Sequence, residues 1–329
     1  MPGRQGANRV TLREVADHAK VSVATVSRVL AGNYPVAAET RRRVEQSIQA
    51  LDYVANVHAR ALAGVAPRTV AFVLPDVRAP AFAHAAQGVE EASAEHGALC
   101  LICTTQGDPE RERAVFQLLR EQRASAVILI GGVIDDAEYR ARIIDLAQGS
   151  RLVLCGRPPV GQVPAVEYAN EAGAHAVTQH LLSAGHQRIL FLGGPLSGPA
   201  TTTVADRLAG YRRALGHPGW TQPAEFTRES GYQQLCARLP EDFTAVFAAT
   251  DLVAAGARAA LRAHGLRVPE DVSLVGYDDL ALAEDLNLTT VRVPYEELGR
   301  AAVHLALSGG TEHEILETSV VVRGSVAPF

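Results

Sequence analysis

The stretch from Thr11 to Leu62, TLREVADHAKVSVATVSRVLAGNYPVAAETRRRVEQSIQALDYVANVHARAL, decides how the N-terminal part of the chain folds. Thr11 and Glu14 have the spacing of a capping box, in which a hydroxyl and a carboxylate each satisfy a free backbone N–H at a helix start. Apolar residues then recur at i, i+3, i+4 and i+7, which predicts one buried face of a short helix. A tight turn follows, and Ser22 is placed to cap a second helix that runs to about Leu30.

Two short helices joined by a turn of three or four residues form a helix-turn-helix, whose second helix enters the major groove of DNA. On that second helix Val26 is expected to face inward, whereas Val23, Ala24, Ser27 and Arg28 share the opposite face. The guanidinium of Arg28 can donate two hydrogen bonds to O6 and N7 of guanine. Taken alone, the pattern is also compatible with an ordinary helical hairpin that carries a solvated arginine.

The continuation of the stretch separates these two interpretations. A third helix is predicted from Thr40 through Leu51, followed by a helix-capable segment, 53–64, with no core of its own. The head VTLREVADHAKVSVATVSRVL closely resembles the lactose-repressor (LacI/GalR) family of bacterial transcription regulators. In that family the following segment is a hinge helix, ordered when two chains pair over DNA, and its leucine wedges into the minor groove. The matching residue here is Leu62.

The chain departs from the family pattern at two positions of this stretch, and the resemblance implies a set of DNA contacts. Ala55 stands where the family usually has proline, and Ala37 replaces the serine that usually caps the third helix, which should lower the stability of the head. The implied partner is a pseudo-palindromic operator in double-stranded DNA, read by two heads. The residues expected to contact DNA are Thr11, Ser22, Val23, Ala24, Thr25, Ser27, Arg28, Arg41, Asn56, Arg60, Leu62 and Ala63.

The charge distribution also favours a DNA-binding head. Residues 1–64 hold nine Lys and Arg against five Asp and Glu, a net charge of +4, so a chain of net charge −5 carries −9 on the remainder (−5 minus +4). A basic head on an acidic body is typical of a DNA-reading module. We expect no signal peptide and no membrane span, because no long apolar stretch occurs, and therefore a cytoplasmic, nucleoid-associated protein.

The cysteines and the known catalytic motifs give no indication of an enzyme. Cys100 and Cys103 form a C-x-x-C inside an apolar run, but residues three apart on a strand point to opposite faces and cannot grip one metal. Neither G-x-S-x-G nor H-E-x-x-H occurs, and the segment GGPLSG lacks the Gly-Lys-Ser/Thr ending of a phosphate loop. We therefore expect reduced thiols, no catalytic or metal-binding residues, no cofactor and no enzymatic activity.

Beyond the head, buried apolar runs alternate with helical patterns. This alternation predicts parallel sheets covered on both faces, in two doubly wound lobes that divide near residue 163. The expected strands are 70–74, 98–103, 126–130, 152–155, 165–168, 188–193, 245–248 and 272–276. The expected helices are 81–96, 109–122, 137–148, 171–184, 204–215, 231–239, 252–264 and 296–307.

The fold class is therefore expected to be α/β, with an all-α helix-turn-helix head and a two-lobed core. The family resemblance implies a periplasmic-binding-protein type I architecture for the core, in which the chain crosses between the lobes three times. The expected boundaries are 1–53 for the head, 54–68 for hinge helix and linker, and 69–329 for the core. Within the core we expect an N-lobe of about 69–163 plus 288–308 and a C-lobe of about 164–287 plus 309–329.

An open parallel sheet binds ligands beyond the carboxyl ends of its strands, which directs attention to a cleft between the lobes. Arg207 in ADRLAGY matches the family's R-x-x-G-aromatic motif, whose arginine reaches the effector. The residues expected to bind an effector are Asp76, Phe82, Arg207, Thr250, Asp251, Asp278 and Tyr295. For five of them an ordinary structural role stays open: a surface ion pair for Arg207, a loop cap for Asp76 or Asp278, and plain core for Phe82 or Tyr295.

These observations favour a sequence-specific DNA-binding repressor, released from its operator when a small metabolite binds between the lobes. The resemblance implies a sugar, a sugar acid or a related metabolite as the ligand. The family's acids are replaced at Cys155 and Ala169, which leaves fewer acceptors for sugar hydroxyls and favours a sugar acid or a non-sugar metabolite. Alternatives are a regulator that needs a co-repressor such as a nucleobase, and a solute-binding protein. The chain is expected to associate with itself as a homodimer or a tetramer. The sequence does not distinguish these two assemblies, and it identifies neither the effector nor the operator sequence.

We predict that Leu62→Ala weakens operator binding and reduces DNA bending, because the wedge that unstacks the central base step is removed. Ligand affinity should be unchanged, since the core is untouched. Gel-shift and bending assays on the same operator fragment measure both properties. Unchanged DNA bending in the variant would show that Leu62 does not act as the wedge.

Overall fold

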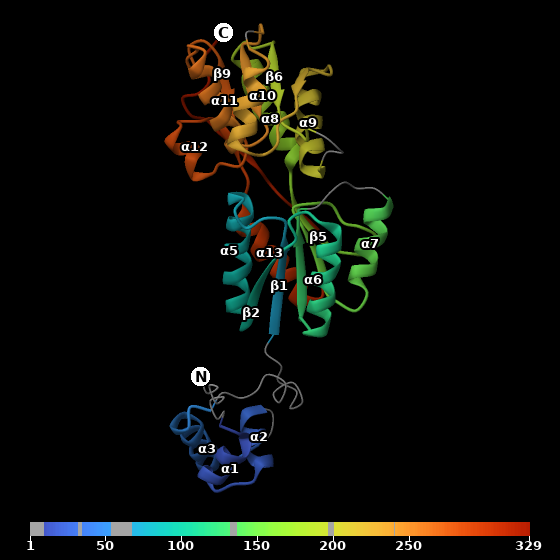
Figure 1. The fold of residues 1–329 in the computed structure, drawn as a ribbon, viewed down its shortest axis with the longest axis vertical. Coiled ribbons are helices and arrows are strands. Elements are labelled where there is room, and N and C mark those ends of the chain that lie inside the picture. The colour runs from blue at the N-terminus through green and yellow to red at the C-terminus, as the bar shows by residue number, and fades with distance from the viewer. Residues whose placement is uncertain (1–9, 32–34, 54–67, 132–136, 197–200, 240) are drawn as a thin grey trace, which may run out of the picture. The chain divides into compact units, whose positions relative to one another are not determined.

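The computed structural model describes residues 10–31, 35–53, 68–131, 137–196, 201–239 and 241–329. The chain divides into two compact units, Met1–Arg68 and Thr69–Phe329 (Figure 1). The expected DNA contacts at Asn56, Arg60, Leu62 and Ala63 lie outside the described residues.

The first unit contains α1 (Leu12–Ala19), α2 (Val23–Ala31) and α3 (Ala38–Ala50). The capping box is confirmed: the Thr11 hydroxyl accepts from the Glu14 N–H at 3.3 Å, and the Glu14 carboxylate accepts from the Thr11 N–H at 2.6 Å. Lys20 ends α1 in the left-handed conformation, with φ of 51°, which turns the chain toward α2. The Ser22 hydroxyl accepts from the Thr25 N–H at 3.1 Å, so the predicted cap of α2 is confirmed.

These three helices share a small core. Tyr53 closes it after α3, donating its N–H to the Ile48 carbonyl at 2.9 Å. α3 begins at Ala38, two residues before the predicted start, and no side chain caps it at Ala37. The buried apolar residues are Val15, Ala16, Ala19, Val26, Val29, Val44 and Tyr53.

The first lobe of the second unit is built on a six-stranded sheet in the order β11-β5-β4-β3-β1-β2. Its strands are β1 (Arg68–Leu74), β2 (Ala98–Thr104), β3 (Ala126–Ile130), β4 (Leu152–Cys155), β5 (Ala165–Tyr168) and β11 (His313–Leu316). The pairs β1–β3, β3–β4, β4–β5 and β5–β11 are parallel, as predicted for this type of core. Val70 lies opposite Ala126 and Leu154 opposite Ala165.

Helices cover both faces of this sheet. Along β1, Val70, Phe72 and Leu74 pack toward α5 (Pro80–Glu95) and α13 (Tyr295–Ser308). The alternate residues Ala71 and Val73 pack toward α6 (Pro109–Glu121) and α7 (Ala137–Ala147). A parallel strand buried on both faces reads as a continuous apolar run, which is why VAFVL was recognisable as a strand.

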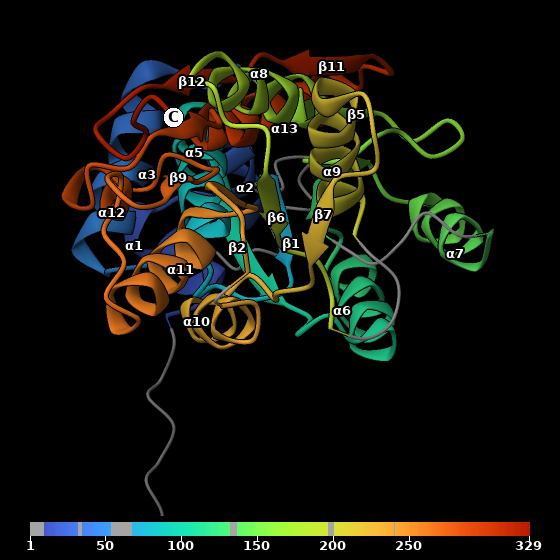
Figure 2. The same ribbon diagram turned by 90° about the horizontal axis from the view of Figure 1, so that it is seen from above.

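The second lobe repeats this plan on a four-stranded sheet in the order β7-β6-β8-β9. Its strands are β6 (Ile189–Leu192), β7 (Trp220–Gln222), β8 (Ala245–Ala248) and β9 (Ser273–Val275). Phe191 and Phe247 face α8 (Asn170–Ser183) and α9 (Thr202–Leu215). Leu190 and Val246 face α10 (Arg228–Cys236) and α11 (Asp251–Ala263), on the opposite side of the sheet (Figure 2).

Three short elements complete the core: α12 (Ala281–Asp285), β10 (Thr290–Arg292) and β12 (Ser319–Val321). β10 and β12 pair antiparallel, with Val291 opposite Val320. None of the three was predicted, and neither were β7 and β11, because these elements are only three to five residues long and do not lie in a long continuous apolar run. No helix of the described residues is long and apolar enough to cross a membrane.

The expected boundary between the lobes needs correction. β5 pairs with β4, so the first sheet extends to Tyr168 and does not end near residue 163. β11 pairs with β5, so residues 313–316 belong to the first sheet and not to the second lobe. An apolar run predicts a strand but does not say which sheet the strand joins, and this is the reason for both errors.

We predict that Ala37→Ser stabilises the head by about 1 kcal/mol, because it supplies the side-chain acceptor that the start of α3 lacks. Thr11→Ala should destabilise the head by a similar amount, since it removes a cap that is present. Hydrogen exchange of the amides of α3 and α1 in the full-length protein measures the two changes. Equal protection in Ala37→Ser and the wild type would show that water already satisfies this helix start.

Candidate functional site

The exposed face of α2 carries the residues predicted to read bases. Arg28 and Ala24 are exposed and Val23 is 42% exposed, whereas Val26 is fully buried. This is the predicted division of the helix into an inner and an outer face. At the N-terminus of α2 the Ser22 and Thr25 hydroxyls lie 2.8 Å apart and are hydrogen-bonded to each other. The N-terminus is the end that a recognition helix places against the bases.

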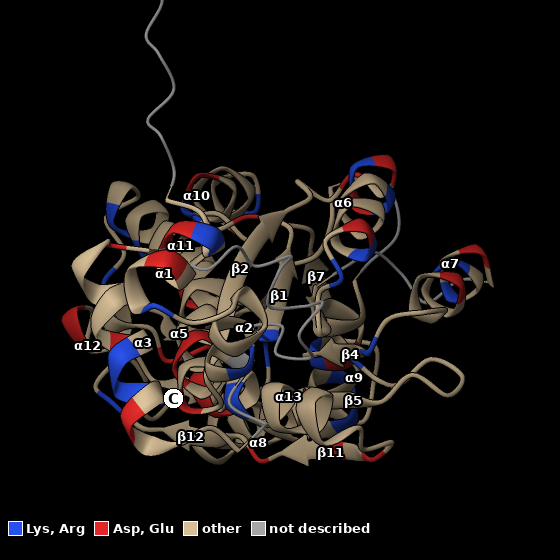
Figure 3. Ribbon diagram, turned by 90° about the horizontal axis from the view of Figure 1, so that it is seen from below, with Lys and Arg blue, Asp and Glu red and all other residues tan. Residues whose placement is uncertain are grey.

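Basic residues gather on α3 of the same unit (Figure 3). Arg42 and Arg43 are exposed, and Arg41 is half-buried. Thr11 is also exposed, although its hydroxyl is engaged with Glu14 in the capping box. Guanidinium groups of this kind neutralise phosphates, which fixes a protein on the duplex without reading its sequence.

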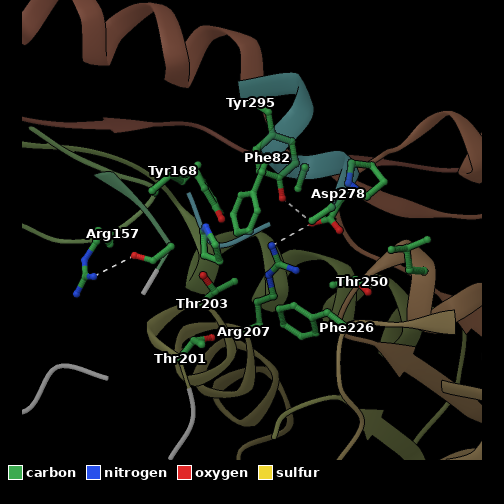
Figure 4. A pocket seen from close by; sticks show the side chains of 18 of the residues that line it. Phe82, Arg157, Tyr168, Thr201, Thr203, Arg207, Phe226, Thr250, Asp278 and Tyr295 are labelled. Carbon is green, nitrogen blue, oxygen red and sulfur yellow. Dashed lines mark hydrogen bonds and ion pairs between the residues drawn. The ribbon is translucent and has the colours of Figure 1, made fainter. Parts of the chain in front are cut away.

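In the second unit, a cavity of about 290 Å³ lies where the two lobes meet (Figure 4). The first lobe contributes Phe82 from α5, Tyr168 from the end of β5 and Tyr295 from the start of α13. Gly131, at the carboxyl end of β3, has φ of 72°, and a Cβ there would come within 2.9 Å of Pro75. The described residues that line the cavity are Pro75, Ala79, Pro80, Ala81, Phe82, Ile130, Gly131, Gly156, Arg157, Tyr168, Thr201, Thr202, Thr203, Arg207, Phe226, Thr250, Leu252, Asp278, Leu280 and Tyr295.

Arg207 projects from α9 and is the largest fully buried side chain among the described residues, with 1% of its surface exposed. Its Nε donates to Asn170 Oδ1 at 3.0 Å, and Nη1 donates to the Ala249 carbonyl at 2.5 Å. Nη2 donates to Asp278 Oδ1 at 3.1 Å. The guanidinium also lies 3.7 Å from the ring centroid of Tyr277, a cation–π contact. The surface ion pair left open from the sequence is thereby excluded.

Asp278 joins the two lobes at this cavity. The Tyr295 hydroxyl, from α13 of the first lobe, donates to Asp278 Oδ1 at 2.7 Å, so this oxygen accepts from both lobes. Burial raises the pKa of the Asp278 carboxyl, whereas Arg207 and the Tyr295 hydroxyl act to lower it. The backbone of Asp278 has φ of 117°, an unfavourable conformation for a residue with a side chain, and its N–H donates to the Val291 carbonyl at 2.8 Å.

Asp251 does not line the cavity. It is fully buried, and its carboxyl oxygens accept from the Thr290 hydroxyl at 2.6 Å and from the Leu280 N–H at 2.8 Å. Asp251 therefore fixes the loop that carries Asp278. Burial, together with the nearby Asp278 carboxylate, raises the pKa of Asp251 to about 8.

Asp76 is also absent from the cavity wall. Its side chain is 41% exposed and pairs with Arg78, from which it also accepts a backbone hydrogen bond at 2.9 Å. This is the loop-capping role left open from the sequence. Thr250 does line the cavity, and its hydroxyl also accepts from the Val253 N–H at 3.2 Å, which caps α11.

The sequence did not single out several lining residues. Tyr168 ends β5, so the strand-end rule would have selected it had β5 been assigned to the first sheet. Its ring meets that of Tyr295 edge to face, with centroids 5.7 Å apart. Phe226 lies beyond the short β7, and Leu252 and Leu280 are apolar side chains with no functional pattern.

The cysteines carry no ligand site in the described part of the chain. No three His, Cys, Asp or Glu side chains of that part are grouped so that they could hold a metal ion. All four cysteines are free thiols. Burial raises the pKa of Cys100 to about 11, so this thiol is protonated and poorly nucleophilic at neutral pH.

A helix-turn-helix head and a two-lobed core with a cavity between its lobes define a DNA-binding transcriptional regulator. Residues 11–56 match the family model for bacterial regulatory proteins of the lacI family, and residues 178–326 match that for a periplasmic binding protein-like domain. The HTH-type regulator DegA of Bacillus subtilis (strain 168) is 31% identical, over 98% of this chain and 99% of its own. The chain belongs to the lacI family.

Two further similarities cover nearly the whole chain. The HTH-type transcriptional regulator CelR of Thermobifida fusca is 36% identical, over 96% of this chain and 98% of its own. The lac repressor dimer bound to operator and the anti-inducer ONPF superposes with a TM-score of 0.89 at 28% identity, covering 97% of this chain and 100% of that one. Head and core are therefore both shared with known regulators.

We predict that the free energy of unfolding of the core falls as pH rises from about 4 to about 8, with Asp251 as one source. The folded protein holds the Asp251 proton up to a pKa of about 8, above the ordinary value of 3.8, so ionisation on raising the pH favours the unfolded chain. Asp251→Asn cannot ionise and should show a shallower decline. Urea unfolding of both proteins across this pH range measures the slopes, and equal slopes would contradict the assignment.

Proposed function

We propose that this protein is a repressor whose affinity for its operator is controlled by a small molecule bound in the cavity between the lobes. The observation that carries this proposal is the link from Arg207 to Asp278 to Tyr295, which joins both lobes at the cavity wall. A ligand placed there contacts both lobes, so its affinity depends on how they are arranged. A preference of about 1–3 kcal/mol for one arrangement is enough to couple the cavity to DNA binding.

On the DNA side, two heads would read the two half-sites of the operator. Arg28 would donate hydrogen bonds to guanine, and Val23 and Ala24 would contact thymine methyls. Hydroxyls and arginines of the head would bind the phosphates. The proposed phosphate contacts are Thr11, Ser22, Thr25, Ser27 and Arg41. Asn56, Arg60, Leu62 and Ala63 would form the hinge that reaches the minor groove, as the family resemblance implies.

The proposed assembly is a homodimer, which acts at the nucleoid in the cytoplasm and carries out no catalysis. β2 is an edge strand of the six-stranded sheet, and Leu99, Leu101 and Ile102 on it are 62%, 36% and 49% exposed. An edge strand with exposed apolar side chains needs cover, and a second copy of the chain supplies it. Two-fold symmetry of the protein then matches the two-fold symmetry of the operator.

The proposed ligand enters the cavity against Phe82, Arg207, Thr250, Asp278 and Tyr295. Its binding would change the angle between the lobes and separate the two hinge segments. A sugar, a sugar acid or a related metabolite is the class implied by the family, and the relative CelR has been solved in complex with cellobiose. A thermal-shift screen of sugars, sugar acids, polyols and nucleosides identifies candidates, since a ligand at 100 times its Kd adds about 2.7 kcal/mol of stability.

We predict that Arg207→Ala abolishes the response to ligand and leaves operator binding in place. The change removes the cation from the cavity wall and leaves Asp278 buried without its partner, which costs about 3–5 kcal/mol of core stability. Arg213→Ala is the matched control, because Arg213 lies on the same helix and pairs with Glu171 at the surface.

Operator titrations with and without the ligand found in the screen give the comparison. The wild type and Arg213→Ala should both be released from DNA by the ligand. A retained response in Arg207→Ala would place the effector elsewhere, and stronger operator binding with ligand would identify a co-repressor.

A further inference from the structure

The cavity wall offers few acceptors to a ligand that is rich in hydroxyl groups. Asp278 is the single carboxylate among the described lining residues, and its Oδ1 already accepts from Arg207 and Tyr295. The hydroxyls of Thr201 and Thr250 each already accept one backbone N–H, at the starts of α9 and α11, and the other hydroxyls of the wall are those of Thr202, Thr203, Tyr168 and Tyr295. A sugar presents a donor at almost every carbon, and each donor buried without an acceptor weakens binding.

Donors, in contrast, remain available. A guanidinium has five N–H groups, and Arg207 uses three of them on Asn170, Ala249 and Asp278, so two are left. Arg157 is a second buried arginine at the cavity, 3% exposed. In Figure 4 it lies at the far side of the cavity from Asp278.

Arg157 is held in place but is not neutralised. Its Nη1 donates to the Gly131 carbonyl at 3.1 Å and to the Tyr139 hydroxyl, and its guanidinium lies 4.4 Å from the Tyr139 ring centroid. Its Nε has no hydrogen-bond partner, and no carboxylate of the described residues forms an ion pair with it. The nearby Glu112 pairs instead with Arg142, at 3.3 Å.

The charges that line the cavity therefore do not cancel. Asp278 balances Arg207, whereas Glu112 lies near both Arg142 and Arg157 and balances only one of these two arginines, so one positive charge remains without a counter-ion among the described residues. A buried charge is destabilising unless it is paired, so a ligand that carries one negative charge is favoured. Carboxylates match the planar fork of a guanidinium.

The remaining wall is apolar and aromatic. Phe82 and Phe226 come from opposite lobes, and Leu252, Leu280 and Ile130 fill the spaces beside them. Aromatic faces bind a flat ring with a large gain from buried surface. A polyhydroxylated ligand would bury its hydroxyls against these side chains without partners.

We propose that the effector is a monoanion with a flat apolar body, an aryl or alicyclic carboxylate. Its carboxylate takes the free guanidinium donors, and its ring packs on the aromatic side chains of the wall. This inference rests on the proposed function, since it assigns the ligand chemistry of the same cavity, and it departs from the sugars and sugar acids that the family resemblance implies.

Four probes separate charge from shape: trans-cinnamate, its neutral amide cinnamamide, gluconate and glucose. Each is added to the full-length protein, and the dissociation constant is taken from the shift in thermal unfolding. Cinnamate should bind at least about tenfold more tightly than each of the other three, because charge-assisted hydrogen bonds and ring burial then act together. The comparison within the wild type needs no variant.

Variants of Arg157 test the source of the charge preference. Arg157→Gln should bring the affinities of cinnamate and cinnamamide together, whereas Arg157→Lys keeps the charge and should keep the preference. Arg120→Gln, at an exposed arginine of α6, is the control and should behave as the wild type. A preference that survives in Arg157→Gln would overturn the role of Arg157.

A cavity-filling variant separates failure of this inference from failure of the proposed function. Ala81→Trp places an indole in the cavity and should abolish binding of any ligand held there, whereas Ala94→Trp, exposed on the same helix, should not. If glucose or gluconate binds best and Ala81→Trp removes that binding, the cavity is the effector site and the ligand class proposed here is wrong. If cinnamate binding survives Ala81→Trp, the cavity assignment itself fails. No stabilisation by cinnamate at millimolar concentration also overturns the inference.

Discussion

A guanidinium buried away from water must be neutralised and hydrogen-bonded, and the arrangement around Arg207 follows from this requirement. Its partners come from distant parts of the chain: Asn170 begins α8, Ala249 follows β8 and Asp278 follows β9. The Tyr277 ring, whose centroid lies 3.7 Å from the guanidinium carbon, completes the enclosure. The carboxyl ends of the neighbouring strands β8 and β9 meet at this arginine, so Arg207 fixes the carboxyl-terminal end of the second-lobe sheet.

The same pair ties the second lobe to the segment that crosses back to the first. Asp278 is hydrogen-bonded through its backbone to Val291 and Val293 and through its side chain to Tyr295. Its φ of 117° is stabilised by these contacts and by Asp251, which holds the loop at Leu280. A residue under backbone strain at a crossing between lobes is a natural point for coupling ligand and conformation. Asp278 therefore belongs both to the cavity wall and to the hydrogen bonds that hold the crossing segment.

Much of the fold could be predicted from the sequence because long helices repeat at a clear period and doubly buried strands are continuous apolar runs. The short strands β7, β10 and β12 show no period, and the run AVEY of β5 identified a strand without identifying its sheet. At the cavity, Phe82, Arg207, Thr250, Asp278 and Tyr295 do lie together. Asp76 and Asp251 do not, since sequence shows a carboxylate near a strand end but not the Arg78 or Thr290 that already engages it.

The position of β11 has a consequence for the order in which the molecule is completed during synthesis. The head has all of its described core once Tyr53 has left the ribosome, and it is able to fold early. The sheet of the first lobe, although it begins at Arg68, receives its last strand only with His313–Leu316, and α13 covers one of its faces. The edge of the sheet at β5 stays unpaired while the second lobe is made, so nascent chains expose this strand edge throughout the synthesis of residues 169–312.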